Sequence, residues 1–196
     1  MSVIIGLTGP TGSGKSLAAK TAEKLNIQVI DCDLYARRAV EKGSLGLSAL
    51  IKVFGAEILN EDETLNRKKL ASIAFSTKEN TNLLNETLLP FIVELVIADI
   101  KGDVVILDAP TLFESGIDSK CDYTISVLAD YEIRRKRIMT RDNLTQKEAE
   151  LRMLAGKNDS YYIEKSDYII YNNGDTEQFK AEFLNILKRG IDYERK

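Results

Sequence analysis

The sequence predicts an α/β fold in which helices wind on both faces of a five-stranded parallel sheet. The first observation is a glycine-rich loop, 9–16, between a strand-like apolar run and a helix-like run. The second is that further short apolar segments recur along the chain with helical patterns between them. The predicted strands are 3–8, 26–31, 103–108, 123–128 and 167–171. Strands that alternate with helices in this way form a parallel sheet.

Length and composition favour one such domain with a helical insertion. The chain has 196 residues, of which 44% are hydrophobic, enough to bury a sizeable core. No uninterrupted apolar run approaches 18 residues, so we expect no membrane span. The N-terminus does not have the pattern of a signal peptide. Cys32 and Cys121 lack metal-site spacing, and we expect a reduced, cytoplasmic setting.

Charge and the absence of histidine restrict the chemistry. The net charge of −3 argues weakly against a nucleic-acid partner. An anionic substrate must therefore be bound by local cations rather than by the overall field. Because the chain has no histidine, a general base must be a carboxylate, and histidine metal sites are excluded.

The loop from Gly9 to Ser16 reads G-x-x-x-x-G-K-S, the phosphate-binding pattern of P-loop NTPases. Its glycines allow successive N–H groups to turn toward an anion at the head of the following helix. Lys15 is expected to reach the β- and γ-phosphates, and the Ser16 hydroxyl to ligate Mg²⁺. A chance glycine-rich turn is the alternative, but the flanking strand and helix disfavour it. The residues expected to contact the nucleotide here are Gly9, Pro10, Thr11, Gly12, Ser13, Gly14, Lys15, Ser16 and Leu17.

Two acids, Asp31 and Asp33, follow the second predicted strand. Ligands bind at the carboxyl edge of parallel sheets, so both are candidate site residues. The alternative for Asp33 is an N-cap of the next helix.

Residues 34–100 are predicted to be helical throughout, which is too long for a simple crossover between strands. We expect an inserted acceptor-binding subdomain, with packing alone as the alternative. Pro90 lies inside its last helix and predicts a kink or a break there. The remaining ranges, 1–33 and 101–196, are expected to form the phosphate-loop core.

Asp108 ends the third predicted strand, which is nearly all apolar. An acid there, in a chain with a phosphate loop, has the position that holds Mg²⁺ or its water shell. A turn or helix cap is the alternative.

A basic helix follows the fourth strand, and Arg137 and Arg141 share one of its faces. A solvated basic face is the ordinary interpretation of such a run. A capping box of Thr145 and Glu148 begins a short helix soon after, and 157–160 is predicted to be a polar break. We therefore expect a closing lid at about 142–160, with arginines that neutralise a transferring phosphoryl group.

Taken together, these motifs resemble the dephospho-coenzyme A kinase family from about residue 4 to residue 174. Beyond the phosphate loop, the more specific segments are Asp31-Cys32-Asp33, Asp108–Glu114 with its Pro-x-Leu-Phe-Glu pattern, Arg137 with Arg141-Asp142, and Asn172-Asn173-Gly174. The resemblance implies ATP-dependent phosphorylation of the ribose 3′-hydroxyl of dephospho-coenzyme A, the last step of coenzyme A biosynthesis. It implies ATP and dephospho-coenzyme A as the small-molecule substrates, and residues 34–100 as the coenzyme A subdomain.

Residue roles carried over by the resemblance are as follows. Asp33 is the candidate base and Arg141 the lid arginine. Lys15 is also a candidate catalytic residue, and Arg137 is expected among the nucleotide-binding residues. Asn172 and Asn173 are expected beside adenine. Asp108 is our own assignment to the Mg²⁺ shell, and Asp31 could equally be there.

The chain departs from the family pattern at Pro10-Thr11 in the loop, at Leu89 where histidine is common, and at Gly156-Lys157. A kinase of another nucleotide or small hydroxyl acceptor is the leading alternative. A GTP-dependent switch is disfavoured because the chain lacks an Asn-Lys-x-Asp motif, and a non-catalytic binder because Lys15 and Asp33 are intact. We expect a monomer or a weak oligomer.

Overall fold

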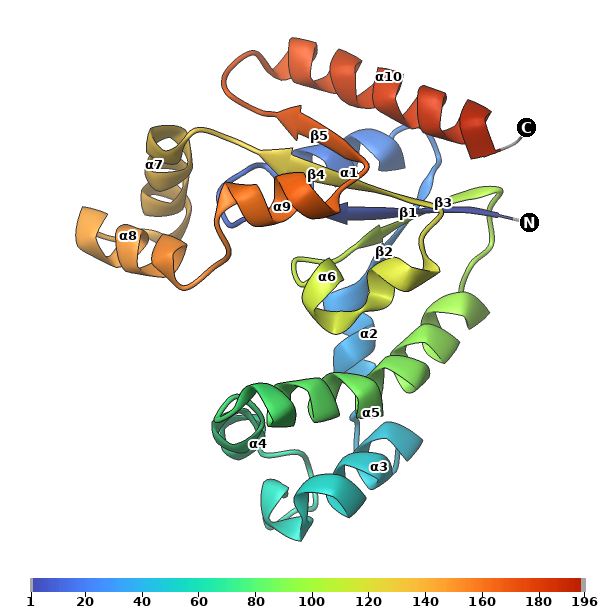
Figure 1. The fold of residues 1–196 in the computed structure, drawn as a ribbon, viewed down its shortest axis with the longest axis vertical. Helices are drawn as coiled ribbons and strands as arrows, with labels where there is room; N and C mark the ends of the chain where they lie inside the picture. The colour runs from blue at the N-terminus through green and yellow to red at the C-terminus, as the bar shows by residue number, and fades with distance from the viewer. Residues whose placement is uncertain (1, 195–196) are drawn as a thin grey trace. The chain divides into compact units, whose positions relative to one another are not determined.

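The computed structural model describes the backbone of residues 2–194 and the side chains of residues 2–192. A five-stranded sheet with the order β2-β3-β1-β4-β5 forms its centre (Figure 1). The pairs of β1 with β3, β1 with β4 and β4 with β5 are parallel. The strands are β1 Val3–Thr8, β2 Gln28–Asp31, β3 Val104–Asp108, β4 Tyr123–Leu128 and β5 Tyr168–Tyr171. The predicted α/β fold is confirmed.

The strand β2 begins later than the sequence pattern predicts. Asn26 adopts φ 59°, in the left-handed region that commonly ends a helix. Its N–H donates to the Glu23 carbonyl, so residues 24–26 still belong to the turn that closes the preceding helix.

The register places the ends of the central strands together. Leu7 pairs with Asp108 on one side of β1, and Thr8 pairs with Ser126 on the other. The loop that follows β1 therefore begins between the carboxyl ends of β3 and β4. Open α/β sheets bind ligands at such a point, where the strand order reverses.

Helices cover both faces of this sheet. Two of them, α1 and α10, pack their apolar side chains onto the core, including Ala18, Ala22, Phe179, Phe183 and Leu187. Burying each large aliphatic or aromatic side chain contributes about 1.5–3 kcal/mol. Figure 1 shows α9 in front of the strands and α1 behind them. The helices are α1 Lys15–Glu23, α6 Leu112–Ser115, α7 Tyr131–Asp142, α8 Gln146–Leu154, α9 Asp159–Lys165 and α10 Thr176–Glu194, with the short 3-10 helix η2 Ile117–Lys120.

The segment after α7 contains one confirmed helix and one that the sequence pattern missed. The capping box of Thr145 and Glu148 begins α8 as predicted. The polar break predicted at 157–160 is wrong, because α9 begins at Asp159. The Asn158 side chain caps α9 by accepting from the Tyr161 N–H at 3.0 Å.

The chain divides into two compact units. The core unit comprises residues 1–30, 101–113 and 118–196, and the helical unit comprises 31–100 and 114–117. The elements of the helical unit are α2 Cys32–Arg38, α3 Leu45–Phe54, η1 Ala56–Ile58, α4 Arg67–Ala74 and α5 Lys78–Ala98. Its own core includes Val40, Leu50, Phe54, Ile58, Leu70 and Ala74.

The N-cap of α2 is Asp31, not Asp33. The Asp31 carboxylate accepts from the N–H groups of Asp33 at 3.0 Å and Leu34 at 3.3 Å. The helix therefore begins at Cys32, and Asp33 lies in its first turn rather than at its cap. Capping does not account for Asp33.

The long helix α5 has 21 residues and continues through Pro90, so the proline does not break the helix. By length and composition α5 could cross a membrane, with a mean hydropathy of 1.3 over its best window. The sequence pattern predicts no membrane span, because no uninterrupted apolar run approaches 18 residues. Core helices of soluble proteins meet the same criteria, so α5 is weak evidence of a membrane span.

Candidate functional site

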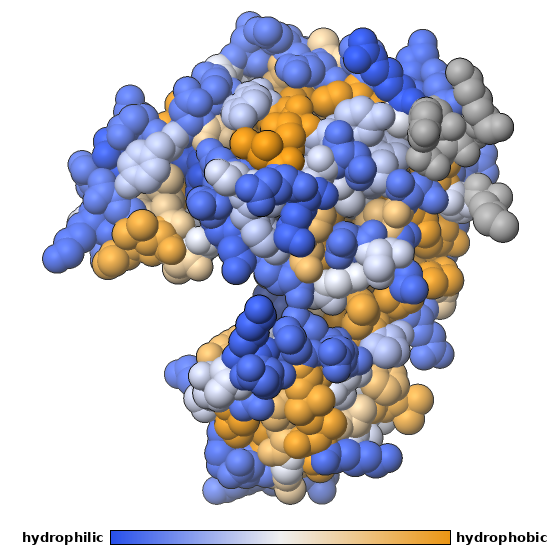
Figure 2. Space-filling model, in the orientation of Figure 1, coloured by the Kyte–Doolittle hydropathy of each residue, from blue (hydrophilic) through white to orange (hydrophobic). Residues whose placement is uncertain are grey.

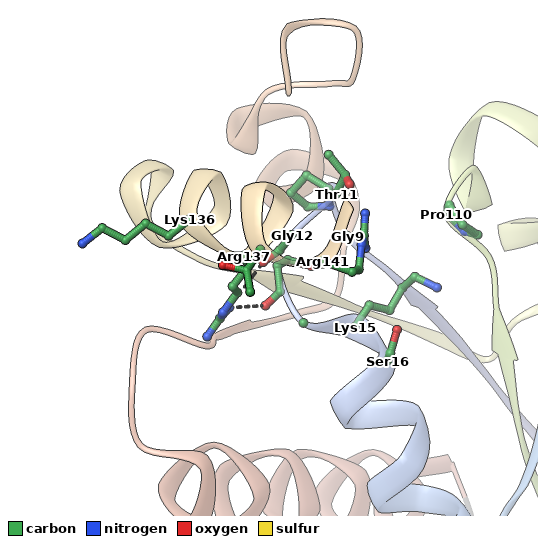
Figure 3. Close-up of a pocket in the computed structure, with 13 residues that line it drawn as sticks. Gly9, Thr11, Gly12, Lys15, Ser16, Pro110, Lys136, Arg137 and Arg141 are labelled. Atoms are coloured by element: carbon green, nitrogen blue, oxygen red, sulfur yellow. Dashed lines mark hydrogen bonds between the residues drawn. The ribbon is translucent and has the colours of Figure 1, made fainter. Parts of the chain in front are cut away.

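A cavity of about 760 Å³ lies against the phosphate loop in the core unit (Figure 3). All the loop residues from Gly9 to Ser16 line it, together with Pro110, Lys136, Arg137, Thr140 and Arg141. The structure thus brings together the predicted loop and both predicted arginines. Leu17 does not line the cavity. It packs instead against the apolar core beneath the sheet.

The loop has a backbone path that two glycines make possible. Gly9 has φ 147°, and a Cβ on it would lie 2.2 Å from the Val127 carbonyl oxygen. Gly12 has φ 80°, and a Cβ there would lie 2.8 Å from the Arg134 carbonyl oxygen. Both the left-handed conformation and the close backbone approach exclude larger residues. The loop therefore packs directly onto β4 and α7.

Two arginines of α7 bind the carbonyl groups of the loop. The Arg137 guanidinium donates to the Gly12 and Ser13 carbonyls at 3.3 and 3.1 Å (Figure 3). Arg134 is only 6% exposed, and its Nε donates to the Thr11 carbonyl at 3.0 Å. Since a planar peptide directs its N–H opposite to its carbonyl, the N–H groups of Gly12 and Gly14 point away from these guanidinium groups. Such an arrangement suits an anion cradle.

Burial lowers the pKa of Arg137 below the ordinary arginine value. Arginine nevertheless stays protonated in proteins. Arg137 therefore keeps a positive charge on the cavity wall while it fixes the loop.

Lys15 and Ser16 lie at the start of α1, where the helix dipole favours an anion. The Lys15 ammonium donates to Oδ1 of Asp108, which ends β3. Ser16 is exposed. The ion pair places the lysine, the hydroxyl and the carboxylate of the predicted phosphate and metal site in one region of the core unit.

Asn172 and Asn173 follow β5, and their side chains bond to protein groups. Asn172 is buried and donates from Nδ2 to the Ser13 carbonyl at 2.9 Å. Asn173 accepts from the Asp130 N–H and donates to the Asp130 carboxylate, both at 2.8 Å. Neither residue lines the cavity, so their expected place beside adenine stays a prediction. What they do here is hold the loop and the start of α7.

Arg141, which is predicted to be the lid arginine, is held by a carboxylate on the next residue. Its Nε and a terminal nitrogen each donate to Asp142 at 2.8 Å. Arg152 of α8 donates to the same carboxylate at 2.6 Å. Arg141 lowers the pKa of Asp142, and Asp142 in turn raises the pKa of Arg141.

The surface of α8 is partly apolar. Leu151 and Leu154 are 58% and 77% exposed. Figure 2 shows hydrophobic side chains gathered over α8 at the left of the molecule.

Sequence reasoning missed Pro110, Lys136 and Thr140 on the cavity wall, and Arg134 behind the loop. Lys136 points away from the loop (Figure 3). The spacing rule that paired Arg137 with Arg141 would also have paired Lys136 with Thr140, since both pairs are four residues apart. No local signal identified Arg134, because its partner Thr11 is distant in the sequence.

Asp31 and Asp33 belong to the helical unit. Asp31 caps α2, and Asp33 lies in the first turn of that helix. Their roles toward the phosphate loop remain predictions.

Comparisons with known proteins show the family to which the chain is related. The model of the family described as dephospho-CoA kinase matches residues 3–178. A dephospho-CoA kinase of Listeria innocua is 36% identical over 198 residues, covering 98% of this chain and 99% of the relative.

Solved structures agree as well. Dephospho-CoA kinase from Campylobacter jejuni aligns with a TM-score of 0.62 at 25% identity, over 96% of each chain. TT1252 from Thermus thermophilus aligns with a TM-score of 0.77 at 28% identity, over 96% of this chain and 97% of that one. Since the family model covers most of its length, this chain, with its phosphate loop and α7 arginines, belongs to the dephospho-CoA kinase family.

Proposed function

We propose that this kinase transfers the γ-phosphoryl group of ATP to the ribose 3′-hydroxyl of dephospho-CoA, which gives coenzyme A and ADP. This is the last step of coenzyme A biosynthesis. The observation that carries the proposal is the cavity formed by the phosphate loop and the α7 cations, in a chain of this family.

In-line phosphoryl transfer needs mainly positioning and charge stabilisation. The loop N–H groups and Lys15 would bind the β- and γ-phosphates. Arg137 and Arg141, which also line the cavity, would contribute positive charge toward the phosphate chain and the transferring group. Asn172 and Asn173 would support the nucleotide side of the site.

Asp33 is the proposed general base for the acceptor hydroxyl. The chain has no histidine, so a carboxylate must take this role. We expect Asp33→Asn to lower kcat by roughly 10²- to 10⁴-fold, with ATP affinity nearly unchanged. Steady-state kinetics and an ATP titration measure both quantities, and near-wild-type turnover would remove Asp33 from the mechanism.

The oxygen donors near the loop fit Mg²⁺. This ion keeps several waters and binds through one or two protein groups together with substrate phosphates. Asp108 offers Oδ2, which no described donor contacts, and Ser16 offers an exposed hydroxyl. No group of three His, Cys, Asp or Glu side chains occurs among the described residues, and such a site needs none. When bound, Mg²⁺ would neutralise the negative charge of the ATP phosphates. Asp31 is the alternative to Asp108 as its carboxylate ligand.

We further propose that residues 34–100 bind the acceptor and that 142–160 act as the lid. Neither Cys32 nor Cys121 forms a disulfide within the described residues, which suits a reducing cytoplasm. Small-molecule substrates, without nucleic acid or membrane, fit the net charge of −3 and the site. We propose a monomer or a weak oligomer.

An ADP-release assay with ATP, Mg²⁺ and dephospho-CoA tests the function. Coenzyme A is the control, because its 3′ position is already phosphorylated and it should be inert. A panel of nucleoside monophosphates and small alcohols covers the alternative of another acceptor. Turnover confined to a member of that panel would refute the proposed function.

A further inference from the structure

Outside the cavity, two aromatic rings and two lysines of the core unit form a cluster. The Phe113 and Tyr161 rings meet edge to face, with centroids 6.1 Å apart. Lys157 places its ammonium 5.3 Å from the Tyr161 ring centroid. Lys165 places its ammonium 5.4 Å from that centroid and 5.7 Å from the centroid of Phe113. We call this group the ring–lysine cluster.

The ammonium groups of Lys157 and Lys165 have no carboxylate partner among the described residues. Both side chains are exposed. Energetically significant cation–π contacts occur roughly once per 70–80 residues. In the described residues, three of the four contacts fall in this cluster. Two ammonium groups around one ring repel each other, and an anion bound between them would relieve that repulsion.

Short segments on both sides tie the cluster to the phosphate loop. Pro110, which lines the cavity, lies three residues before Phe113. On the other side, Asp159 lies two residues before Tyr161 and accepts from Arg134 at 3.0 Å. The same buried arginine holds the Thr11 carbonyl of the loop. The cluster is thus fixed to the loop without being part of the cavity wall.

We infer that Lys157 and Lys165 bind the 5′-diphosphate of the acceptor nucleotide, with Phe113 and Tyr161 holding the two ammonium groups in place. The inference rests on the proposed function. The ATP phosphates have their own cations in the cavity, and none of the four cluster residues lines it. Dephospho-CoA brings a second diphosphate, which lies one ribose away from the reacting hydroxyl. Figure 2 shows hydrophilic side chains over α9, where that diphosphate would be exposed to solvent at its edge.

The experiment measures KM for each substrate in the double variant Lys157→Gln/Lys165→Gln. Because the variant loses the charge-assisted hydrogen bonds to the diphosphate, KM for dephospho-CoA should rise by roughly 10- to 100-fold. KM for ATP and kcat at saturating acceptor should stay within about twofold, since the cavity is untouched. The variant with Lys157→Arg/Lys165→Arg should restore acceptor KM to within about threefold of wild type, because it keeps both charges.

The matched control is Lys24→Gln/Lys120→Gln, which removes two exposed charges elsewhere in the core unit. It should leave every constant unchanged, so an equal rise in KM there would show an effect of net charge rather than of the cluster. A rise in KM for ATP alone would assign the lysines to the nucleotide and overturn the inference. Unchanged acceptor KM in an active double variant would also overturn it. A wild-type enzyme inactive on dephospho-CoA would instead refute the proposed function.

Discussion

The phosphate loop and the lid segment are both held by arginines of α7, but in different ways. Arg134 is buried and Arg137 partly buried, and both donate to carbonyls of the loop backbone. Arg141 leaves 57% of its side chain exposed and pairs with the neighbouring Asp142. The loop is therefore fixed at its backbone, whereas the first residue of the predicted lid, Asp142, is held through a partly exposed carboxylate.

Buried contacts suit a segment that must stay in place, and exposed ion pairs suit a segment that moves. Removing one partner of a buried charged hydrogen bond leaves the other group unsatisfied, which is costly. Exposed ion pairs contribute only about 0–1 kcal/mol each and can exchange partners. The loop is thus suited to hold phosphates in one geometry. We predict that Arg141 changes partners when the segment 142–160 closes.

The largest effect should follow from Lys15→Met, which removes the charge of the loop itself. Losing one preorganised charge donor lowers kcat by about 10²- to 10³-fold. Lys20→Met is the control, because Lys20 is an exposed lysine of the same helix α1. If both variants retained wild-type kcat and ATP affinity, the phosphate-loop assignment would be wrong.

The next largest effect should follow from Arg134→Gln, which removes the buried donor of the Thr11 carbonyl together with the ion pair to Asp159. A small displacement of a positioned substrate costs up to about 10²-fold in rate, so we expect kcat to fall roughly 10- to 100-fold. The neighbouring Arg135→Gln removes only the ion pairs with Glu132 and Glu150 and should change kcat by less than about twofold. Equal losses in the two variants would contradict the contrast between backbone fixation and surface pairing. Thermal unfolding of both checks that each variant is folded.

A smaller effect should follow from Arg152→Gln, which removes one of the two guanidinium groups on Asp142. Because the Arg152 side chain is half exposed and Arg141 still pairs with Asp142, kcat should stay within about threefold of wild type. Stopped-flow measurement of lid motion with a fluorophore on α8 would show whether the rate of closure changes. A loss of kcat as large as that of Arg134→Gln would show that the lid is positioned as rigidly as the loop.

The smallest effect concerns pH. Arg141 holds the pKa of Asp142 below its ordinary value of 3.8. A carboxyl whose pKa is depressed by folding contributes stability above its unfolded pKa, and that contribution is lost as pH falls through the folded pKa. The urea midpoints of wild type and Asp142→Asn should therefore differ by a constant amount above about pH 5 and converge below about pH 4. A gap that widens on acidification would mean that the sign is reversed.

Local patterns predicted much of the fold. The five strands, the capping box of α8 and the phosphate loop follow from apolar periodicity and from residues adjacent in sequence. The pattern missed α9, because a helix of seven residues with a polar start has too few turns to show periodicity. The alternative that placed the cap of α2 at Asp33 is two residues too late, since both Asp31 and Asp33 are good capping residues.

The site contacts that the sequence pattern did not predict are long-range ones. Arg134 meets Thr11 across 123 residues of sequence, and Asn172 meets Ser13 across 159. Nothing near either residue distinguishes a buried brace from a solvated charge or a polar turn. The sheet order brings these segments together, so their partners become visible only once the strands are paired.

Product identification by ³¹P NMR tests the central claim most directly. The enzyme, ATP, Mg²⁺ and dephospho-CoA should yield ADP and one new phosphomonoester, on the ribose 3′ carbon, in equal amounts. The Lys15→Met variant should form this product far more slowly. Free inorganic phosphate in place of the ester, or an ester at another position, would contradict the claim that the loop of residues 9–16 delivers the γ-phosphoryl group to that hydroxyl.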